Sequence, residues 1–252
     1  MRFRDWGCWT PRSPRRRFAA RPSPLPSATD SPLLCYITDR KAFPVKSAIA
    51  DVFASIRRAI EAGVDWVQIR EKDLSGRELS WLVRKAIEAA AERGSRTRIL
   101  VNDRLDVAIA AGAAGVHLGG ESLPVREAAN WIAERRKERR AAANFLVGAS
   151  CHGLEETLAA ERDGASYVVF GPVFETPSKA RFGPPLGTAP LREACGRARI
   201  PVLAVGGVNA ANAGECFQAG AAGIAAIRLF QEAPSAGELR AAIDSLRPRA
   251  AR

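Results

Sequence analysis

Short apolar runs rich in β-branched residues alternate along the chain with longer stretches in which apolar residues recur at helical spacing. From Leu33 onward this alternation occurs in eight rounds. The pattern predicts strands at Leu33–Thr38, Trp66–Arg70, Ile99–Asn102, Gly115–Leu118, Leu146–Ala149, Tyr167–Phe170, Val202–Val205 and Ile224–Ile227. Amphipathic stretches such as Val45–Ala62 and Arg77–Arg93 lie between them and are long enough for the crossover that parallel strands require. The chain is therefore predicted to form an α/β fold with a parallel sheet.

The number of units favours a closed barrel. Eight β/α units within residues 33–247 are what a single (β/α)8 TIM barrel contains. An open doubly wound sheet is the alternative, but eight strands without a long topological break suit closure better. A chain of 252 residues that is 47% hydrophobic can bury one such core, and this composition excludes collagen-like, disordered and disulfide-scaffold classes. Uncharged stretches such as 201–214 and 216–227 are too short to span a membrane.

The net charge of +11 is concentrated near the N-terminus, where residues 1–30 hold seven Arg against two Asp. Residues 1–32 also hold six of the sixteen prolines. This composition predicts a disordered, basic, Pro/Arg-rich extension at 1–32, followed by the barrel at 33–247 and a C-terminal tail at 248–252. An organellar leader, an RNA-contacting tail and an overlong start remain open for the extension. Because no basic stripe interleaved with aromatic residues follows, nucleic acid is a weak hypothesis.

The cysteine pattern indicates a reducing compartment. The five cysteines are an odd number, form no C-x-x-C pair and follow no secretory signal. We therefore expect free thiols and a cytoplasmic location, with neither disulfides nor a zinc site.

Polar side chains gather where the predicted strands end and their loops begin, which is where TIM barrels place reactive groups. These positions are Thr38-Asp39, Gln68-x-Arg70-x-Lys72, Asn102-Asp103, Ser150, Thr176 with Ser178 and Lys179, and Gly206-Gly207. The strand starts carry no comparable set. The sequence therefore predicts a functional site at the carboxyl ends of the strands.

The end of the second predicted strand indicates an anion site. A period of two places Gln68, Arg70 and, if the strand persists, Lys72 on one face. Two cations facing the barrel mouth would be costly to desolvate without a partner, and a diphosphate would satisfy both. The alternative is an internal ion-pair network closed by Asp103 or Asp39.

The end of the third predicted strand offers a metal site. Asn102 and Asp103 present two oxygen ligands, and magnesium is usually held by few protein oxygens together with substrate phosphates. The alternative is that both residues only cap a helix predicted to begin at Arg104.

Two other features have a structural and a functional interpretation. Gly206 and Gly207 precede a helix predicted to begin near Ala210, and such a turn can cradle a phosphate on backbone N–H groups. Tight strand-to-helix turns also need glycine for conformational reasons alone. His117 and His152 have no obvious partner carboxylate in the sequence, which favours structural roles for both.

Seven motifs occur in order between about Leu33 and Phe230. They are Tyr36-Ile37-Thr38-Asp39-Arg40, Gln68-Ile69-Arg70-Glu71-Lys72-Asp73, Val101-Asn102-Asp103-Arg104, Gly115-Val116-His117-Leu118-Gly119, Gly148-Ala149-Ser150, the run from Gly171 to Lys179, and Val205-Gly206-Gly207-Val208. On these motifs the chain resembles the family of thiamine phosphate synthase and its relative, the thiazole tautomerase.

The resemblance implies a transferase of thiamine biosynthesis. Such an enzyme couples hydroxymethylpyrimidine diphosphate to thiazole phosphate, giving thiamine phosphate and diphosphate, with Mg2+ as cofactor. In the family's mechanism Mg2+ and the cations stabilise the departing diphosphate, a pyrimidine-methyl cation forms, and the thiazole nitrogen captures it. The implied partners are these small molecules, with no membrane and with a homo-oligomer left open.

The resemblance also assigns roles to individual residues. The pyrimidine-diphosphate positions of the family fall on Gln68, Arg70, Lys72, Asn102, Ser150 and Lys179, of which Arg70, Lys72, Ser150 and Lys179 would carry the catalytic role. The thiazole phosphate positions fall on Thr176, Ser178, Gly207 and Ile227. One of the family's two magnesium ligands falls on Asp103.

Two positions depart from the family pattern. Ser122, in the run Gly119-Gly120-Glu121-Ser122, stands where the family has its second magnesium-binding aspartate, so Glu121 or Ser122 is left to complete the metal site. Arg228 replaces a serine that helps to hold the thiazole phosphate, and it would either strengthen a phosphate contact or fill the pocket. Pro172 stands where the tautomerase has its catalytic histidine. A tautomerase-like enzyme is therefore the alternative, and a non-catalytic thiazole-phosphate-binding relative is the third hypothesis.

Overall fold

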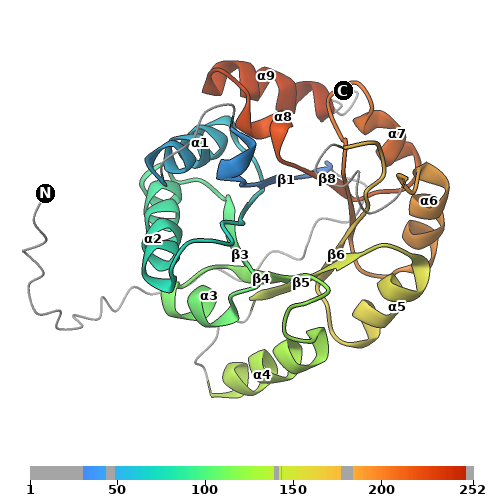
Figure 1. The fold of residues 1–252 in the computed structure, drawn as a ribbon, viewed down its shortest axis with the longest axis horizontal. Helices are drawn as coiled ribbons and strands as arrows, with labels where there is room; N and C mark the ends of the chain where they lie inside the picture. Colours follow the sequence, from blue (N-terminus) through green and yellow to red (C-terminus); the bar gives the residue numbers. More distant parts are fainter. Residues whose placement is uncertain (1–30, 44–48, 139–141, 143, 177–183, 248–252) are drawn as a thin grey trace, which may run out of the picture.

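The computed structural model describes residues 31–43, 49–138, 142, 144–176 and 184–247, and these form a closed parallel barrel (Figure 1). Each strand pairs with the next, and β8 pairs with β1. The strands are β1 Leu33–Ile37, β2 Trp66–Ile69, β3 Arg98–Asn102, β4 Gly115–Leu118, β5 Leu146–Cys151, β6 Tyr167–Phe170, β7 Val202–Val205 and β8 Gly223–Ala226. The predicted TIM barrel is confirmed.

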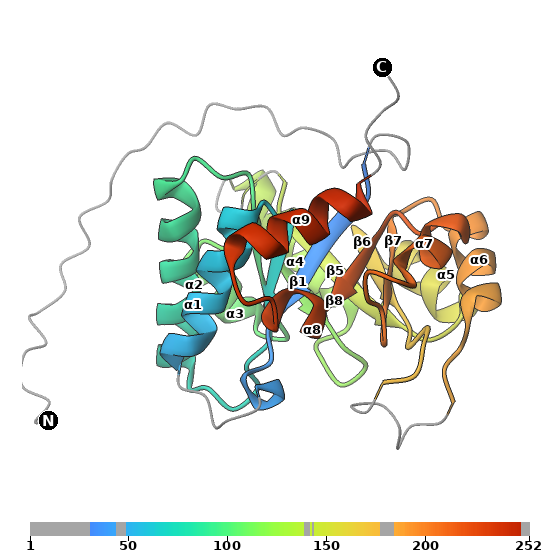
Figure 2. The same ribbon diagram turned by 90° about the horizontal axis from the view of Figure 1, so that it is seen from above.

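Helices surround the barrel in an outer ring, as Figures 1 and 2 show. They are α1 Ile49–Ala62, α2 Gly76–Glu92, α3 Leu105–Ala111, α4 Val125–Lys137, α5 Leu154–Arg162, α6 Thr188–Arg197, α7 Ala213–Gln218, α8 Arg228–Gln231 and α9 Ala236–Leu246, with a 3-10 turn at Arg40–Ala42. The start of α2 is fixed by a capping box, in which Ser75 and Glu78 exchange side-chain and backbone hydrogen bonds. Among the described residues, no helix has the length and apolar character needed to cross a membrane.

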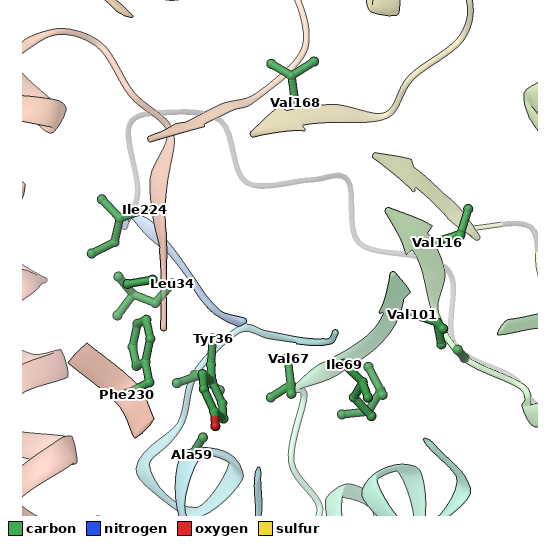
Figure 3. Packing of buried hydrophobic residues seen from close by; sticks show 14 of the residues in the cluster. Leu34, Tyr36, Ala59, Val67, Ile69, Val101, Val116, Val168, Ile224 and Phe230 are labelled. Atoms are coloured by element: carbon green, nitrogen blue, oxygen red, sulfur yellow. The ribbon is translucent and has the colours of Figure 1, made fainter. Parts of the chain in front are cut away.

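The alternation of side chains along β1 divides the core into two parts. Leu33, Cys35 and Ile37 belong to a cluster inside the barrel. Leu34 and Tyr36 belong to the larger cluster between the strands and the surrounding helices, part of which Figure 3 shows. Both clusters are apolar because every strand is covered on both faces, which leaves the polar residues of the strands concentrated at the barrel ends.

Several boundaries differ from those predicted. The strand β2 ends at Ile69, so the alternation that was expected to carry Lys72 into the barrel stops before Arg70. The helix after β7 begins at Ala213 rather than near Ala210, so the loop that follows Gly207 in the sequence is longer than predicted. The predicted extension at 1–32, apart from its last two residues, and the predicted tail at 248–252 lie outside the described residues.

Candidate active site

A chain of hydrogen bonds joins the carboxyl ends of β2, β3 and β4. Gln68 Nε2 donates to Asn102 Oδ1 at 2.9 Å, and Asn102 Nδ2 donates to Asp103 Oδ2 at 2.6 Å. From the β4 side, the Ser122 hydroxyl donates to Asp103 Oδ1 and accepts the Gly119 N–H at 2.7 Å. The structure therefore connects four predicted site residues, Gln68, Asn102, Asp103 and Ser122, in one hydrogen-bonded chain.

The backbone of Asp103 is in the left-handed conformation, with φ of 60°. Non-glycine residues adopt this conformation rarely, and the strain that it stores is found most often at functional positions. The helix α3 begins at Leu105, and its N-cap is Arg104, which makes no side-chain cap. The interpretation of Asn102 and Asp103 as helix caps is therefore wrong, because both side chains face the neighbouring strand ends.

The side-chain oxygen of Gln68 indicates where a ligand would bind in the site. Gln68 is 1% exposed, and among the described residues its Oε1 has no hydrogen-bond partner, although its Nε2 donates to Asn102. A buried amide oxygen without a partner costs about 1–3 kcal/mol, so it is usually matched by water or a ligand. The acceptor is oriented by the bond to Asn102, which uses the donor side of the amide.

The two cations after β2 have different surroundings. Arg70 Nη1 lies 3.7 Å from Asp39 Oδ2, and both side chains are partly exposed. Lys72 is exposed, and within the described part of the chain it makes no ion pair. The expectation of two unpaired cations is therefore wrong for Arg70, whose charge is partly balanced by Asp39. An incoming anion would have to compete with that carboxylate or share the guanidinium with it.

Between these cations lies a buried carboxylate that sequence reasoning did not single out. Glu71 accepts the Arg40 N–H at 3.2 Å and lies 3.6 Å from Arg40 Nε. Burial raises the pKa of Glu71, against the opposing effect of hydrogen bonds from Thr38 and the Arg40 backbone. The Thr38 hydroxyl also accepts the Arg70 N–H at 3.0 Å. Glu71 and Thr38 therefore fix the loop after β1 against the segment that carries Arg70.

The predicted site residue Ser150 lies at the end of β5 and contacts a buried histidine. Its hydroxyl is 2.9 Å from His117 Nε2, and His117 Nδ1 is 3.2 Å from the Tyr167 hydroxyl. Burial lowers the pKa of His117 to about 4. His117 is therefore neutral at pH 7, and the structural role expected for it agrees with its two hydroxyl neighbours, one of which is Ser150.

The loops after β6 and β7 are hydrogen-bonded to each other through their backbones. The Val173 N–H donates to the Val205 carbonyl at 2.8 Å, and the Phe174 N–H donates to the Gly206 carbonyl at 2.9 Å. Gly207 has φ of 66°, and a Cβ there would lie 2.4 Å from the Glu175 carbonyl oxygen. Glycine at 207 is thus required by the close approach of the two loops, which brings it beside the segment that carries Thr176.

The remaining predicted phosphate contacts lie around α8. Ile227 directly precedes this short helix, and its carbonyl accepts the Gln231 N–H at 2.9 Å. The Arg228 side chain is 56% exposed, with its Nε 3.9 Å from Glu232 Oε1, so it does not fill a pocket. Ser178 and Lys179 lie outside the described residues.

The donor set around Asp103 fits magnesium only with help from a substrate. Among the described residues, no group of three or more His, Cys, Asp or Glu side chains could hold a metal ion. Asp103 supplies one carboxylate, Ser122 a hydroxyl, and Glu121 is exposed. Magnesium accepts one or two protein carboxylates when substrate phosphates and water complete its shell. A pocket of about 250 Å³, lined in part by Lys72, Asn102 and Asp103, adjoins this carboxylate.

Comparison with known proteins identifies the family of the chain. The family model described as thiamine monophosphate synthase matches residues 34–230. A putative thiamine-phosphate synthase from Geobacter sulfurreducens is 40% identical over 85% of this chain and 94% of its own. The thiamine-phosphate synthase from Chlorobium luteolum is 38% identical over 82% of this chain and 89% of its own.

Solved structures give the same result. Thiamine phosphate pyrophosphorylase from Pyrococcus furiosus superposes with a TM-score of 0.69 at 33% identity, covering 85% of this chain and 96% of that one. A 3-hexulose-6-phosphate synthase, at 19% identity and a TM-score of 0.59, shares the barrel fold alone. The chain therefore belongs to the thiamine monophosphate synthase family.

Proposed function

We propose that this protein is a thiamine-phosphate synthase, a transferase that couples hydroxymethylpyrimidine diphosphate to thiazole phosphate. The family match and the names of the relatives support this reaction. The observation in the structure that carries the proposal is the buried Oε1 of Gln68, to which no described residue donates a hydrogen bond.

The Gln68 oxygen fits the pyrimidine half of the reaction. An aminopyrimidine ring presents an exocyclic N–H donor, and Gln68 Oε1 is an oriented acceptor in a 1% exposed position. Asp103 is an acceptor only, so it fixes the direction of the hydrogen bonds from Asn102 and thereby that of Gln68. In the proposal, the ring enters the barrel mouth until its amino group meets this oxygen.

The diphosphate half would lie among the cations. Arg70 and Lys72 follow β2 directly, and we assign Lys179 to the same role from the family motif. Magnesium would be held by Asp103 and the diphosphate oxygens, with Ser122 or Glu121 beside it, and would supply charge neutralisation to the leaving group.

The proposed chemistry asks the protein for positioning and charge stabilisation rather than for a nucleophile. The bond between the pyrimidine methylene carbon and the diphosphate oxygen breaks, and the electron pair leaves with diphosphate. Arg70, Lys72 and Lys179 would stabilise the charge that develops on that oxygen. A new bond then forms between the methylene carbon and the thiazole nitrogen. Ser150, placed by His117, would contact the pyrimidine diphosphate at the barrel mouth.

The thiazole phosphate would be held on the other side of the mouth. Contacts to it would come from Gly207 on the loop after β7, Ile227 before α8 and Thr176 after β6. The family motif adds Ser178 to this set. Arg228 is exposed at the N-terminal end of α8, where it can add a charged contact to the phosphate.

The alternative function is isomerisation of a thiazole phosphate, as in the tautomerase. Pro172, which replaces the tautomerase histidine, has no proton to transfer, and this favours the synthase. The discriminating experiment supplies purified protein with both substrates and Mg2+, and with each substrate omitted in turn. Thiamine phosphate and diphosphate in equal amounts only from the complete mixture support the synthase. Tautomerase turnover without coupling would overturn it.

We also propose a cytoplasmic location, which is supported by the cysteines. The four in the described part of the chain are free, and burial raises the pKa of each thiol, so none is poised for disulfide exchange.

A further inference from the structure

A buried glutamine at the end of α8 is hydrogen-bonded to β1 and to the loop that follows it. The strand β1 pairs with β8 and so closes the barrel. Gln231 is 2% exposed, and its Nε2 donates to the Asp39 carbonyl at 2.9 Å. Its Oε1 accepts the Asp39 N–H at 3.2 Å and the Tyr36 hydroxyl at 3.0 Å. Both polar ends of the amide are thus used, and together they fix the backbone of Asp39 at the end of β1.

Asp39 in turn contacts Arg70, which belongs to the proposed diphosphate subsite. The Asp39 carboxylate lies 3.7 Å from Arg70 Nη1, and its Oδ1 is held by the Lys41 N–H at 3.0 Å. Any shift of the Asp39 backbone therefore moves the carboxylate that faces the Arg70 guanidinium.

The backbone of Gln231 is hydrogen-bonded to Ile227, which belongs to the proposed thiazole phosphate subsite. The helix α8 has four residues, and its first carbonyl acceptor, Ile227, receives the Gln231 N–H at 2.9 Å. The neighbouring Phe230 packs against Tyr36, with ring centroids 6.0 Å apart, and Figure 3 shows these two rings side by side. The Gln231 carbonyl accepts from Arg58 on α1 at 3.1 Å. The short helix is therefore one packed unit between Ile227 and Asp39.

We propose that Gln231 is a positioning residue that couples the two substrate subsites, an inference that rests on the proposed function. A phosphate bound beside Ile227 sets the position of α8, which moves as one packed unit. Gln231 transmits that position to Asp39, and Asp39 sets the position of Arg70 for the diphosphate. Each ligand then binds more tightly when the other is present, and the two effects are equal because coupling is reciprocal.

The test uses two ligands that cannot react with each other. Inorganic diphosphate with Mg2+ is titrated calorimetrically into the protein, alone and with saturating thiazole phosphate. For the wild-type chain we expect thiazole phosphate to lower the Kd of diphosphate about five- to tenfold. In Gln231→Met, which keeps the length of the side chain and loses its three hydrogen bonds, we expect this factor to fall to about one.

The matched control is Gln218→Met, which makes the same change at an exposed glutamine on α7 and should keep the wild-type coupling factor. If Gln231→Met does not fold, as judged by circular dichroism, Gln231→Glu serves instead. Glutamate keeps an acceptor for the Asp39 N–H but places an oxygen against the Asp39 carbonyl, so coupling should again be lost. A merely structural role would lower thermal stability and leave the coupling factor unchanged.

Two results would overturn the inference while leaving the proposed function standing. One is a wild-type protein that binds both ligands independently. The other is a folded Gln231 variant that retains the wild-type coupling. Failure of the wild-type chain to bind either ligand would instead refute the proposed function, and the inference with it.

Discussion

Gln68 Nε2 donates to Asn102 Oδ1 at 2.9 Å, and this bond leaves Gln68 Oε1 as a buried acceptor without a partner in the part of the chain that the structure describes. Gln68→Met keeps the size of the side chain and removes the acceptor. We expect the KM for the pyrimidine diphosphate to rise about 10- to 100-fold, because the amino group of the ring would lose its hydrogen bond. The measurement is steady-state kinetics with the amino substrate and with an analogue that lacks the amino group. Equal losses for both substrates would contradict the assigned contact.

Arg70 is the cation nearest to the end of β2, and the proposed chemistry needs it for the departing diphosphate. Arg70→Ala should lower kcat/KM by about 10²- to 10³-fold, with little change in thermal stability because the side chain is partly exposed. Lys179→Ala should lower kcat/KM for thiamine phosphate formation by a similar factor. The control is Arg126→Ala, which removes a surface ion pair with Asp163. Turnover near the wild-type rate in Arg70→Ala would rule out the assignment.

Ser122 hydrogen-bonds to the Asp103 carboxylate. The resemblance to the family implies a second acidic metal ligand at the position of Ser122. Ser122→Asp should lower the Mg2+ concentration for half-maximal activity about tenfold, since a second carboxylate strengthens binding of the ion. Without metal, the two adjacent carboxylates should repel and reduce thermal stability. Ser122→Asn is the matched control with no added charge. An unchanged metal titration in Ser122→Asp would show that this position does not face the ion.

Gly148 lies on β5 against the ring of Tyr167. A Cβ at 148 would lie 2.1 Å from Tyr167 Cζ, so Gly148→Ala must displace the ring that neighbours His117. We expect a loss of about 1–3 kcal/mol or more in the free energy of unfolding, as for other overpacked cores. Gly214→Ala, on α7 with nothing within 4 Å of the added Cβ, should be neutral or stabilising. Denaturant unfolding of both variants is the measurement, and equal stabilities would contradict the packing argument.

The buried His117 should make stability depend on pH. Its pKa falls from 6.5 to about 4 on folding, so between these values the unfolded chain binds a proton that the folded chain does not. The stabilisation is therefore present above pH 6.5 and is lost as pH falls toward 4, by about 3 kcal/mol. His117→Gln in the metal-free protein should flatten this dependence. If the free energy of unfolding changes with pH equally in wild type and His117→Gln, His117 is not the source of the pH dependence.

Much of the fold could be predicted because strand alternation is a local signal. Three strands, β4, β6 and β7, have the predicted bounds, and the polar strand ends meet at one mouth because parallel strands in a barrel share their direction. The contacts among Gln68, Asn102 and Asp103 follow from the pairing of β2 with β3. Neighbouring strand ends are thus the part of a barrel site that a sequence indicates best.

The parts that escaped prediction depend on closure of the barrel and on loop conformation. Gln231 and Tyr36 are 195 residues apart, and a glutamine near the end of a short helix gives no sign in the sequence that it is buried. The ion pair of Arg70 with Asp39 was one of two open alternatives, because the sequence does not show which carboxylate the loop after β1 presents. The left-handed backbone of Asp103 likewise depends on the strand ends around it.

The most direct test of the account is the rate of thiamine phosphate formation by the wild-type protein from both substrates, measured with Mg2+ and with a chelator in its place. The account predicts product and diphosphate in equal amounts with Mg2+, and none with the chelator. Absence of product with Mg2+, although both substrates bind in calorimetry, would contradict the synthase and leave a binding protein or a tautomerase.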